Sequence, residues 1–154
     1  MKVVKATLNA QGKKFAVLVS RFNDFITKRL LEGALNELGR QGTDEKKIEV
    51  IWVPGAFEMP CLAQRLAKSK KYDALICLAA VIKGETPHFD YVASEAAKGI
   101  ASISLHTGVP VIFGVVTAEN MEQAIERAGL KSGNRGEDAA RVAIEMANLI
   151  ETIG

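Results

Sequence analysis

The sequence predicts a single three-layer α/β domain, in which a parallel sheet lies between two layers of helices. Short apolar runs alternate with segments whose apolar residues recur every three or four positions, as strands alternating with helices do. The most apolar run, residues 74–82, is typical of a strand that is covered on both faces. At 154 residues the chain is long enough for one domain with a substantial core and too short for two.

The first third of the chain contains two candidate strands and one clear helix. Residues 3–8 could form a first strand, although no partner for it within the chain is evident, and residues 15–19 form a short buried strand. An amphipathic helix begins at Asp24 and ends near Gly39 and Gly42. Its inward stripe recurs every four residues at Ile26, Leu30, Ala34 and Leu38.

The middle of the chain repeats this strand and helix alternation. A strand over residues 48–53 precedes a helix that opens at Ala56, and Pro60 is tolerable there because it lies near the first turn. The strand over residues 74–82 ends in the polar turn 83–86. Thr86 is then expected to cap a helix with Pro87 at its first position. The inward residues of that helix are Phe89, Val92, Ala96, Ile100 and Ile103.

The last strand is predicted over residues 109–116, with Pro110 at its entrance, and helices over residues 119–128 and 136–150 complete the chain. Strands that alternate with helices of this length imply right-handed crossovers and a parallel sheet. The predicted fold is therefore a flavodoxin-like α/β/α domain that spans residues 1–154.

Composition excludes several classes of function. A net charge of +2, with no basic run, gives no reason to expect a nucleic-acid partner. No apolar run approaches the roughly 20 residues of a membrane span, and the N-terminal residues do not resemble a signal peptide, so we expect a cytoplasmic protein. Cys61 and Cys77 are expected to be free, buried thiols, and two histidines without ligand spacing predict no metal.

Residues with useful chemistry gather at the carboxyl ends of the predicted strands, where open parallel sheets bind their ligands. Phe22 and Phe57 could stack on a planar heterocycle while Glu58 accepts hydrogen bonds from its polar groups. The alternative is that both rings cover the core and that the Glu58 carboxylate interacts favourably with the positive end of the helix dipole.

The turn at residues 83–86 could hold an anion against the following helix, although Thr86 could instead spend its hydroxyl on capping. Arg127 could bind a phosphate through its forked guanidinium, although most helical arginines are simply solvated. His106 has a structural explanation at a helix C-terminus. His88 stands at a helix N-terminus, where a neutral, proton-transferring imidazole fits better than a structural one.

Five linked motifs then carry a resemblance that spans nearly the whole chain. They are RFN at 21–23, VPGAFE at 53–58, VIKGETPHFDY at 81–91, FGV at 113–115, and AIERAG at 124–129 followed by GNRG at 133–136. This set resembles the 6,7-dimethyl-8-ribityllumazine synthase family of riboflavin biosynthesis. The resemblance implies condensation of 5-amino-6-(D-ribitylamino)uracil with 3,4-dihydroxy-2-butanone 4-phosphate, giving the lumazine, phosphate and water. It implies no metal or organic cofactor.

The resemblance also implies roles for individual residues. Phe22 and Phe113 would contact the pyrimidine, Glu85 and Thr86 would bind the phosphate-bearing substrate, Arg127 would grip its phosphate, and His88 would donate the proton. The ring and ribityl chain would be held by Ala56, Phe57, Glu58, Ala80, Val81 and Ile82. The chain departs mildly from the family pattern at Ala79, Lys83, Arg135 and Asp138, so no firm role is assigned to them.

The same resemblance implies an assembly. Family sites lie between adjacent subunits of a pentamer, so Phe113 and Arg127 would serve the His88 of a neighbour, and the strand at residues 3–8 would add to a neighbouring sheet. The short loop at residues 129–136 resembles that of members whose pentamers form icosahedral shells, and riboflavin synthase is a candidate partner. The alternatives are a non-catalytic flavin- or phosphate-binding module and a shell-forming carrier of the same fold.

Overall fold

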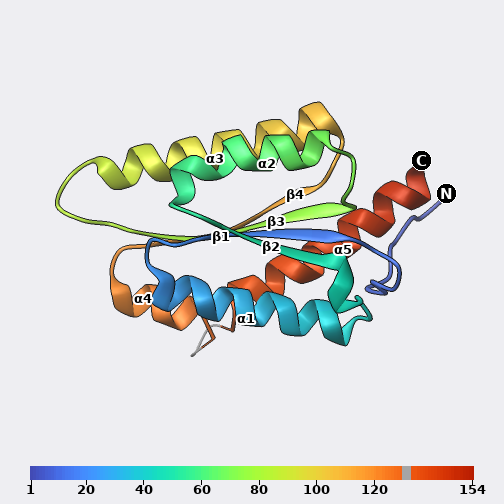
Figure 1. Cartoon of the computed structure of the whole chain (residues 1–154), viewed down its shortest axis with the longest axis horizontal. Helices are drawn as coiled ribbons and strands as arrows, with labels where there is room; N and C mark the ends of the chain where they lie inside the picture. Colours follow the sequence, from blue (N-terminus) through green and yellow to red (C-terminus); the bar gives the residue numbers. More distant parts are fainter. Residues whose placement is uncertain (130–132) are drawn as a thin grey trace.

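The computed structural model of this chain describes residues 1–129 and 133–154 and contains a parallel sheet with strand order β2-β1-β3-β4 (Figure 1). The strands are β1 (Phe15–Ser20), β2 (Ile48–Val53), β3 (Ala74–Ile82) and β4 (Val111–Ala118). The α-helices are α1 (Asp24–Arg40), α2 (Met59–Lys68), α3 (His88–Thr107), α4 (Met121–Arg127) and α5 (Arg135–Ile153), and two short 3₁₀ helices are η1 (Glu45–Lys47) and η2 (Ala56–Glu58).

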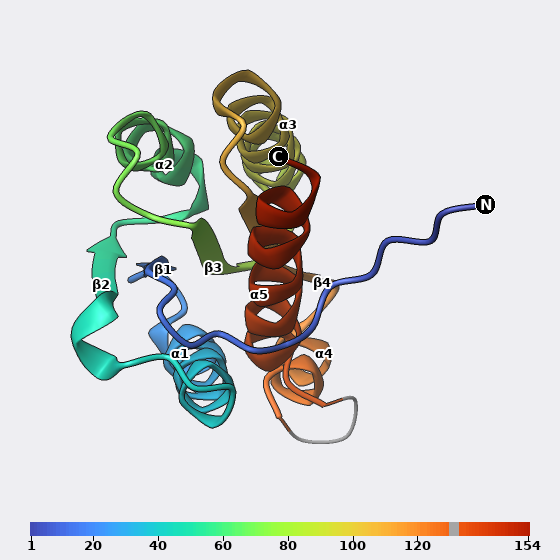
Figure 2. The same cartoon turned by 90° about the vertical axis from the view of Figure 1, so that its right-hand side faces the viewer.

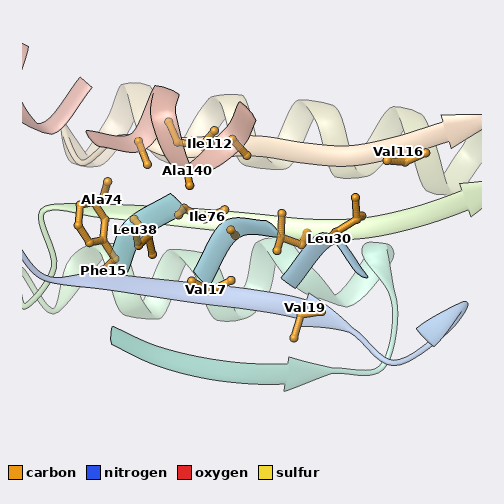
Figure 3. Packing of buried hydrophobic residues seen from close by; sticks show 14 of the residues in the cluster. Phe15, Val17, Val19, Leu30, Leu38, Ala74, Ile76, Ile112, Val116 and Ala140 are labelled. Carbon is orange, nitrogen blue, oxygen red and sulfur yellow. The ribbon is translucent and has the colours of Figure 1, made fainter. Parts of the chain in front are cut away.

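Helices cover both faces of the sheet, as the fold prediction requires (Figure 2). Residues of α2 and α3 pack on one face against alternate residues of β1 and β3, including Leu18 and Cys77. Residues of α1, α4 and α5 pack on the other face. Figure 3 shows this second cluster, in which Leu30 and Leu38 of α1 lie over the same face of the sheet as Val17 and Ile76. The flavodoxin-like three-layer architecture is therefore confirmed.

The inward stripes predicted for α1 and α3 are also confirmed. Ile26, Leu30, Ala34 and Leu38 are fully buried, as are Ala96 and, nearly so, Ile100 and Ile103. Helix α5 approaches α1 closely at Gly136, where no side chain separates the two backbones. A Cβ on Gly136 would collide with the backbone carbonyl of Leu30. No helix in the described part of the chain is long and apolar enough to cross a bilayer.

Residues 3–8 do not form the predicted strand within this chain. The segment has no regular secondary structure, and its apolar side chains Val3 and Val4 are exposed. The Asn148 side-chain amide of α5 donates to the carbonyls of Thr7 and Asn9, both at 2.9 Å. A strand needs a neighbour with free backbone groups. The segment pairs with neither β2 nor β4, the two edge strands.

Three local predictions are corrected. Helix α3 begins at His88 with Pro87 at the cap position, so Thr86 lies one residue too early for its hydroxyl to cap the helix. The last strand begins at Val111 and runs to Ala118, because β3 offers partners as far as Ile82. Cys61 is exposed on the outer face of α2, and only Cys77 is a buried thiol. Burial raises the pKa of Cys77 to about 12.

Candidate active site

The turn between β1 and α1 presents Phe22 at the carboxyl edge of the sheet. The backbone amide of Arg21 donates to the carbonyl of Val53 at 2.7 Å, and that of Phe22 donates to the carbonyl of Pro54 at 2.9 Å. These bonds fix the turn against the end of β2. Phe22 is 56% exposed, so its ring is accessible to a ligand at this edge.

A hollow of about 290 Å³ lies between this turn, the η2 segment and the start of α3, and we call it the α3 hollow. Its lining is aromatic with a carboxylate and an imidazole, which suits a flat heterocycle with polar substituents. It is lined by Phe22, Gly55, Phe57, Glu58, His88, Tyr91 and Val92. The structure thus brings together Phe22, Phe57, Glu58 and His88, which were predicted as site residues from separate motifs.

His88 is the first residue of α3 and is exposed. It shares the α3 hollow with Glu58, so an acceptor carboxylate and a titratable imidazole face the same volume. A side chain of this type within reach of a bound substrate can transfer protons near neutral pH. Tyr91 was not predicted as a site residue. Its position three residues after His88 places it on the same helix face, and this spacing could have revealed it.

The polar turn between β3 and α3 is exposed throughout, including Glu85 and Thr86. Lys83 at its start pairs with Glu119, with 3.6 Å between the ammonium nitrogen and the carboxylate oxygen. Because Thr86 does not cap α3, its hydroxyl is not committed to the helix. The turn therefore offers polar groups next to the helix N-terminus, where anions are favoured.

The end of β3 offers the candidate site main-chain groups more than side chains. Ala80 and Val81 are buried, and Ile82 is half-buried. Ala56 is likewise buried, at the start of η2. The residues Ala80, Val81 and Ile82 pair with the last three residues of β4, so their position is fixed by the sheet. Any ligand contact at Ala56 or Ala80 must then be chiefly with the main chain.

A second hollow, of about 560 Å³, lies along β4 and the start of α5, and we call it the β4 hollow. Phe113 and Arg127 line it, together with Arg135 and Asp138. An Nη1 atom of Arg127 donates to the carbonyl of Thr117 at 2.7 Å, which orients the guanidinium. Arg135 and Asp138 form an ion pair at 3.5 Å. This hollow is cationic and suits an anion such as a phosphate.

The two hollows have no lining residue in common among those described. One chain therefore places Phe22, Glu58 and His88 apart from Phe113 and Arg127. Among residues 1–129 and 133–154, no group of three or more His, Cys, Asp or Glu side chains is arranged to hold a metal ion.

Comparison with known proteins explains why these motifs occur together. The sequence pattern of the 6,7-dimethyl-8-ribityllumazine synthase family matches residues 12–151. The chain belongs to this family. Two relatives named 6,7-dimethyl-8-ribityllumazine synthase cover almost the whole chain. The one from Clostridium kluyveri is 59% identical over 153 residues, which are 99% of each chain. The one from Desulfatibacillum aliphaticivorans is 60% identical over 150 residues, which are 97% of each chain.

The family predicted from the five motifs is therefore confirmed. Members of the lumazine synthase family are transferases that act on small molecules and generally assemble into oligomers. Eleven residues of the five motifs line the α3 hollow or the β4 hollow: Phe22, Gly55, Phe57, Glu58, His88, Tyr91, Phe113, Gly114, Val115, Arg127 and Arg135.

Proposed function

We propose that this chain condenses 5-amino-6-(D-ribitylamino)uracil with 3,4-dihydroxy-2-butanone 4-phosphate to give 6,7-dimethyl-8-ribityllumazine, phosphate and water, the penultimate step of riboflavin biosynthesis. The observation that carries the proposal is the convergence of Phe22, Glu58 and His88 on one hollow, in a chain whose residues 12–151 match the family. The comparisons give no support to a non-catalytic flavin-binding module or carrier.

In this proposal the α3 hollow binds the uracil substrate. The Phe22 ring stacks on the pyrimidine, and the Glu58 carboxylate accepts hydrogen bonds from the ribityl hydroxyls. Phe57 borders the same space, and the main chain at Ala56 and at residues 80–82 holds the ring and the ribityl chain. These assignments are supported by the placement of all three segments at the carboxyl ends of the strands.

The second substrate lies between the turn at Glu85 and Thr86 and a guanidinium. The substrate amine attacks the ketone, and loss of water gives an imine. Elimination of phosphate then leaves an enol, which tautomerises to a new ketone. Attack of the ribitylamino nitrogen on this ketone, with loss of a second water, closes the ring. His88 moves protons in these steps, while the two binding surfaces hold the reactants in contact. No step requires a cofactor.

A complete site needs both hollows. We propose that Phe113 and Arg127 of one subunit meet the α3 hollow of its neighbour, so that Arg127 grips the phosphate beside the neighbour's Glu85 and Thr86. The separation of the two hollows on one chain supports this arrangement. The exposed apolar side chains Phe113 and Val142, which line the β4 hollow, also support a covering subunit there.

The proposed oligomer is a pentamer, which could assemble further into an icosahedral shell in the cytoplasm with riboflavin synthase as a candidate partner. Residues 3–8 would form a strand only on a neighbouring sheet, and their exposure in the single chain fits that role. The loop at residues 129–136 was predicted to favour shells, but its residues 130–132 lie outside the described part of the chain.

Incubation of the purified protein with both substrates tests the proposal. We expect lumazine fluorescence to appear well above the spontaneous rate, and His88→Ala to lower kcat by roughly 10²-fold or more. His106→Ala is the matched control, because His106 is exposed at the far end of α3 and bonds only to Ser102 in the described structure. A protein that purifies with bound FMN and forms no lumazine would contradict the proposal.

A further inference from the structure

Gly55 joins β2 to η2, and its backbone conformation does not explain why it is a glycine. Its φ of −154° and ψ of 178° are extended values that any residue adopts. The residue is buried, so surface flexibility is not the reason either. The need for glycine at this position must come from the atoms that surround its α-carbon.

Those atoms belong to two residues of the α3 hollow. A Cβ on Gly55 would lie 2.6 Å from Cδ2 and 3.1 Å from Cε2 of Phe22, and 3.2 Å from Oε1 of Glu58. Carbon atoms in contact are normally about 3.5 to 4.0 Å apart, so an added methyl group would displace the ring by the order of 1 Å. The Phe22 ring occupies the space that the missing side chain leaves.

The ring cannot accommodate a methyl group by moving its backbone. The Phe22 amide donates to the Pro54 carbonyl at 2.9 Å, and the Phe22 carbonyl accepts from the Ser20 hydroxyl at 3.3 Å. The Arg21 guanidinium also lies over the ring, 5.2 Å from its centroid. The remaining response is rotation of the side chain into the open hollow, which changes the surface that a bound ring would meet.

This distinguishes Gly55 from the glycines of the core. Gly114 packs against Leu78, the Cys77 carbonyl and Ala139, so a larger residue there would disturb the packing of the sheet. The groups around Gly55 are exposed side chains of the candidate site. A larger residue at position 55 would therefore cost little folding free energy and would change the geometry of the α3 hollow.

We propose that Gly55 is a positioning residue for the uracil substrate: it seats the Phe22 ring and the Glu58 carboxylate so that both meet one flat, polyhydroxylated ligand. This inference rests on the proposed function and deepens it. Gly55 touches no reacting atom, and it acts through the two side chains that its small size admits.

The test is Gly55→Ala in the assembled enzyme. We expect the KM for ribitylaminouracil to rise about tenfold, because displacements near 1 Å in a binding site have large effects. The KM for the butanone phosphate should change by less than about twofold, since that substrate is held elsewhere. Calorimetric titration with ribitylaminouracil alone should show the same weakening. Gly39→Ala is the control, because nothing lies within 4 Å of a Cβ there, and neither KM should change.

The decisive comparison uses Phe22→Ala. In that background Gly55→Ala should raise the KM for ribitylaminouracil by less than about twofold, because the ring at 2.6 Å is gone and only the looser 3.2 Å approach to Glu58 remains. An equal effect of Gly55→Ala with and without the ring, or an equal rise in both KM values, would overturn the proposal. If Gly55→Ala fails to fold, Phe22→Ala/Gly55→Ala must fold, and an unfolded double variant would also overturn it. A wild-type protein that makes no lumazine would instead refute the proposed function.

Discussion

The side-chain amide of Asn23 donates to the main-chain carbonyl of Ala80 at 2.8 Å and so ties the start of α1 to the end of β3. Asn23 adopts the left-handed conformation, with φ 60° and ψ 42°, and its side chain makes no cap bond to α1. The residue next to Phe22 thereby fixes the distance between the proposed stacking ring and the proposed binding backbone at residues 80–82.

Two replacements of Asn23 should separate the contribution of its hydrogen bond to stability from that of its left-handed backbone conformation. Asn23→Gly keeps the left-handed backbone and loses the hydrogen bond, so we expect a loss of about 1 kcal/mol in unfolding free energy. Asn23→Ala loses the same bond but keeps a Cβ in the left-handed region, so it should be about 1 to 2 kcal/mol less stable than Asn23→Gly. Urea denaturation of the two variants measures both terms. Equal stability of Asn23→Gly and wild type would show that the bond to Ala80 contributes nothing.

Arg127→Ala should weaken binding of the butanone phosphate. Loss of a forked contact to a largely desolvated phosphate is expected to cost about 2 to 3 kcal/mol, which is a rise in KM of roughly 30- to 150-fold. Arg127→Lys should recover part of this, because the charge remains and the fork is lost. Arg65→Ala, at the exposed end of α2, is the control. An unchanged KM for that substrate in Arg127→Ala would contradict the phosphate contact.

Mixed oligomers test whether the site is shared. His88→Ala and Arg127→Ala each lack one half of the proposed site, and each alone should have little activity when the butanone phosphate is below its raised KM. If equal amounts are dissociated and reassembled together, roughly a quarter of the sites in a ring would combine an intact His88 with an intact Arg127 from the neighbour. Steady-state assays should then recover about that fraction of wild-type activity. Absence of recovery in mixed particles, verified by native mass spectrometry, would place both residues in one subunit's site.

The surroundings of Glu37, between α1 and α5, predict that the free energy of unfolding depends on pH in the acid range. It is only 1% exposed and accepts hydrogen bonds from Gln41 at 2.8 Å and Arg40 at 3.0 Å, while Arg141 pairs with it at 3.0 Å. Burial acts to raise the pKa of Glu37, but these hydrogen bonds and the charges of Arg141 and Arg40 outweigh it, so the pKa is lowered.

Because the pKa of Glu37 is lower in the folded state than in the unfolded state, the ionised carboxylate stabilises the fold at pH values above the unfolded-state pKa of about 4.5. This stabilisation is lost as the pH falls through the folded-state pKa. Glu37→Gln should therefore lower the unfolding free energy by about 1 to 3 kcal/mol at neutral pH. The difference from wild type should shrink below pH 4.5. Glu32→Gln, on the exposed face of α1, is the control. A difference that does not change with pH would show that the ionised form of Glu37 is not what matters.

Much of the fold was predictable because it depends on periodicity that is local in the sequence. The four-residue recurrence from Ile26 to Leu38 determined which face of α1 is buried, and the uninterrupted apolar run of β3 determined that helices cover the sheet on both sides. Strand and helix alternation then predicted that the strands run parallel, and a parallel sheet places Phe22, Glu58 and His88 at one edge.

Side-chain exposure and helix starts were less predictable, because they depend on neighbours that are distant in the chain. Thr86 has the residue type of a cap, but the turn brings Pro87 to the cap position. Cys61 has an apolar character and still faces outward from α2. Residues 3–8 have the composition of a strand, yet a strand exists only where another offers its backbone groups.

The sequence by itself determined the family, the layer order and the residue types of the candidate site, because linked motifs and periodic burial are properties of the chain. Only the tertiary structure decided that the site residues form two hollows and that the space beside Gly55 is filled by the Phe22 ring. Such contacts depend on distances between atoms that the fold brings together, and no spacing along the chain encodes them.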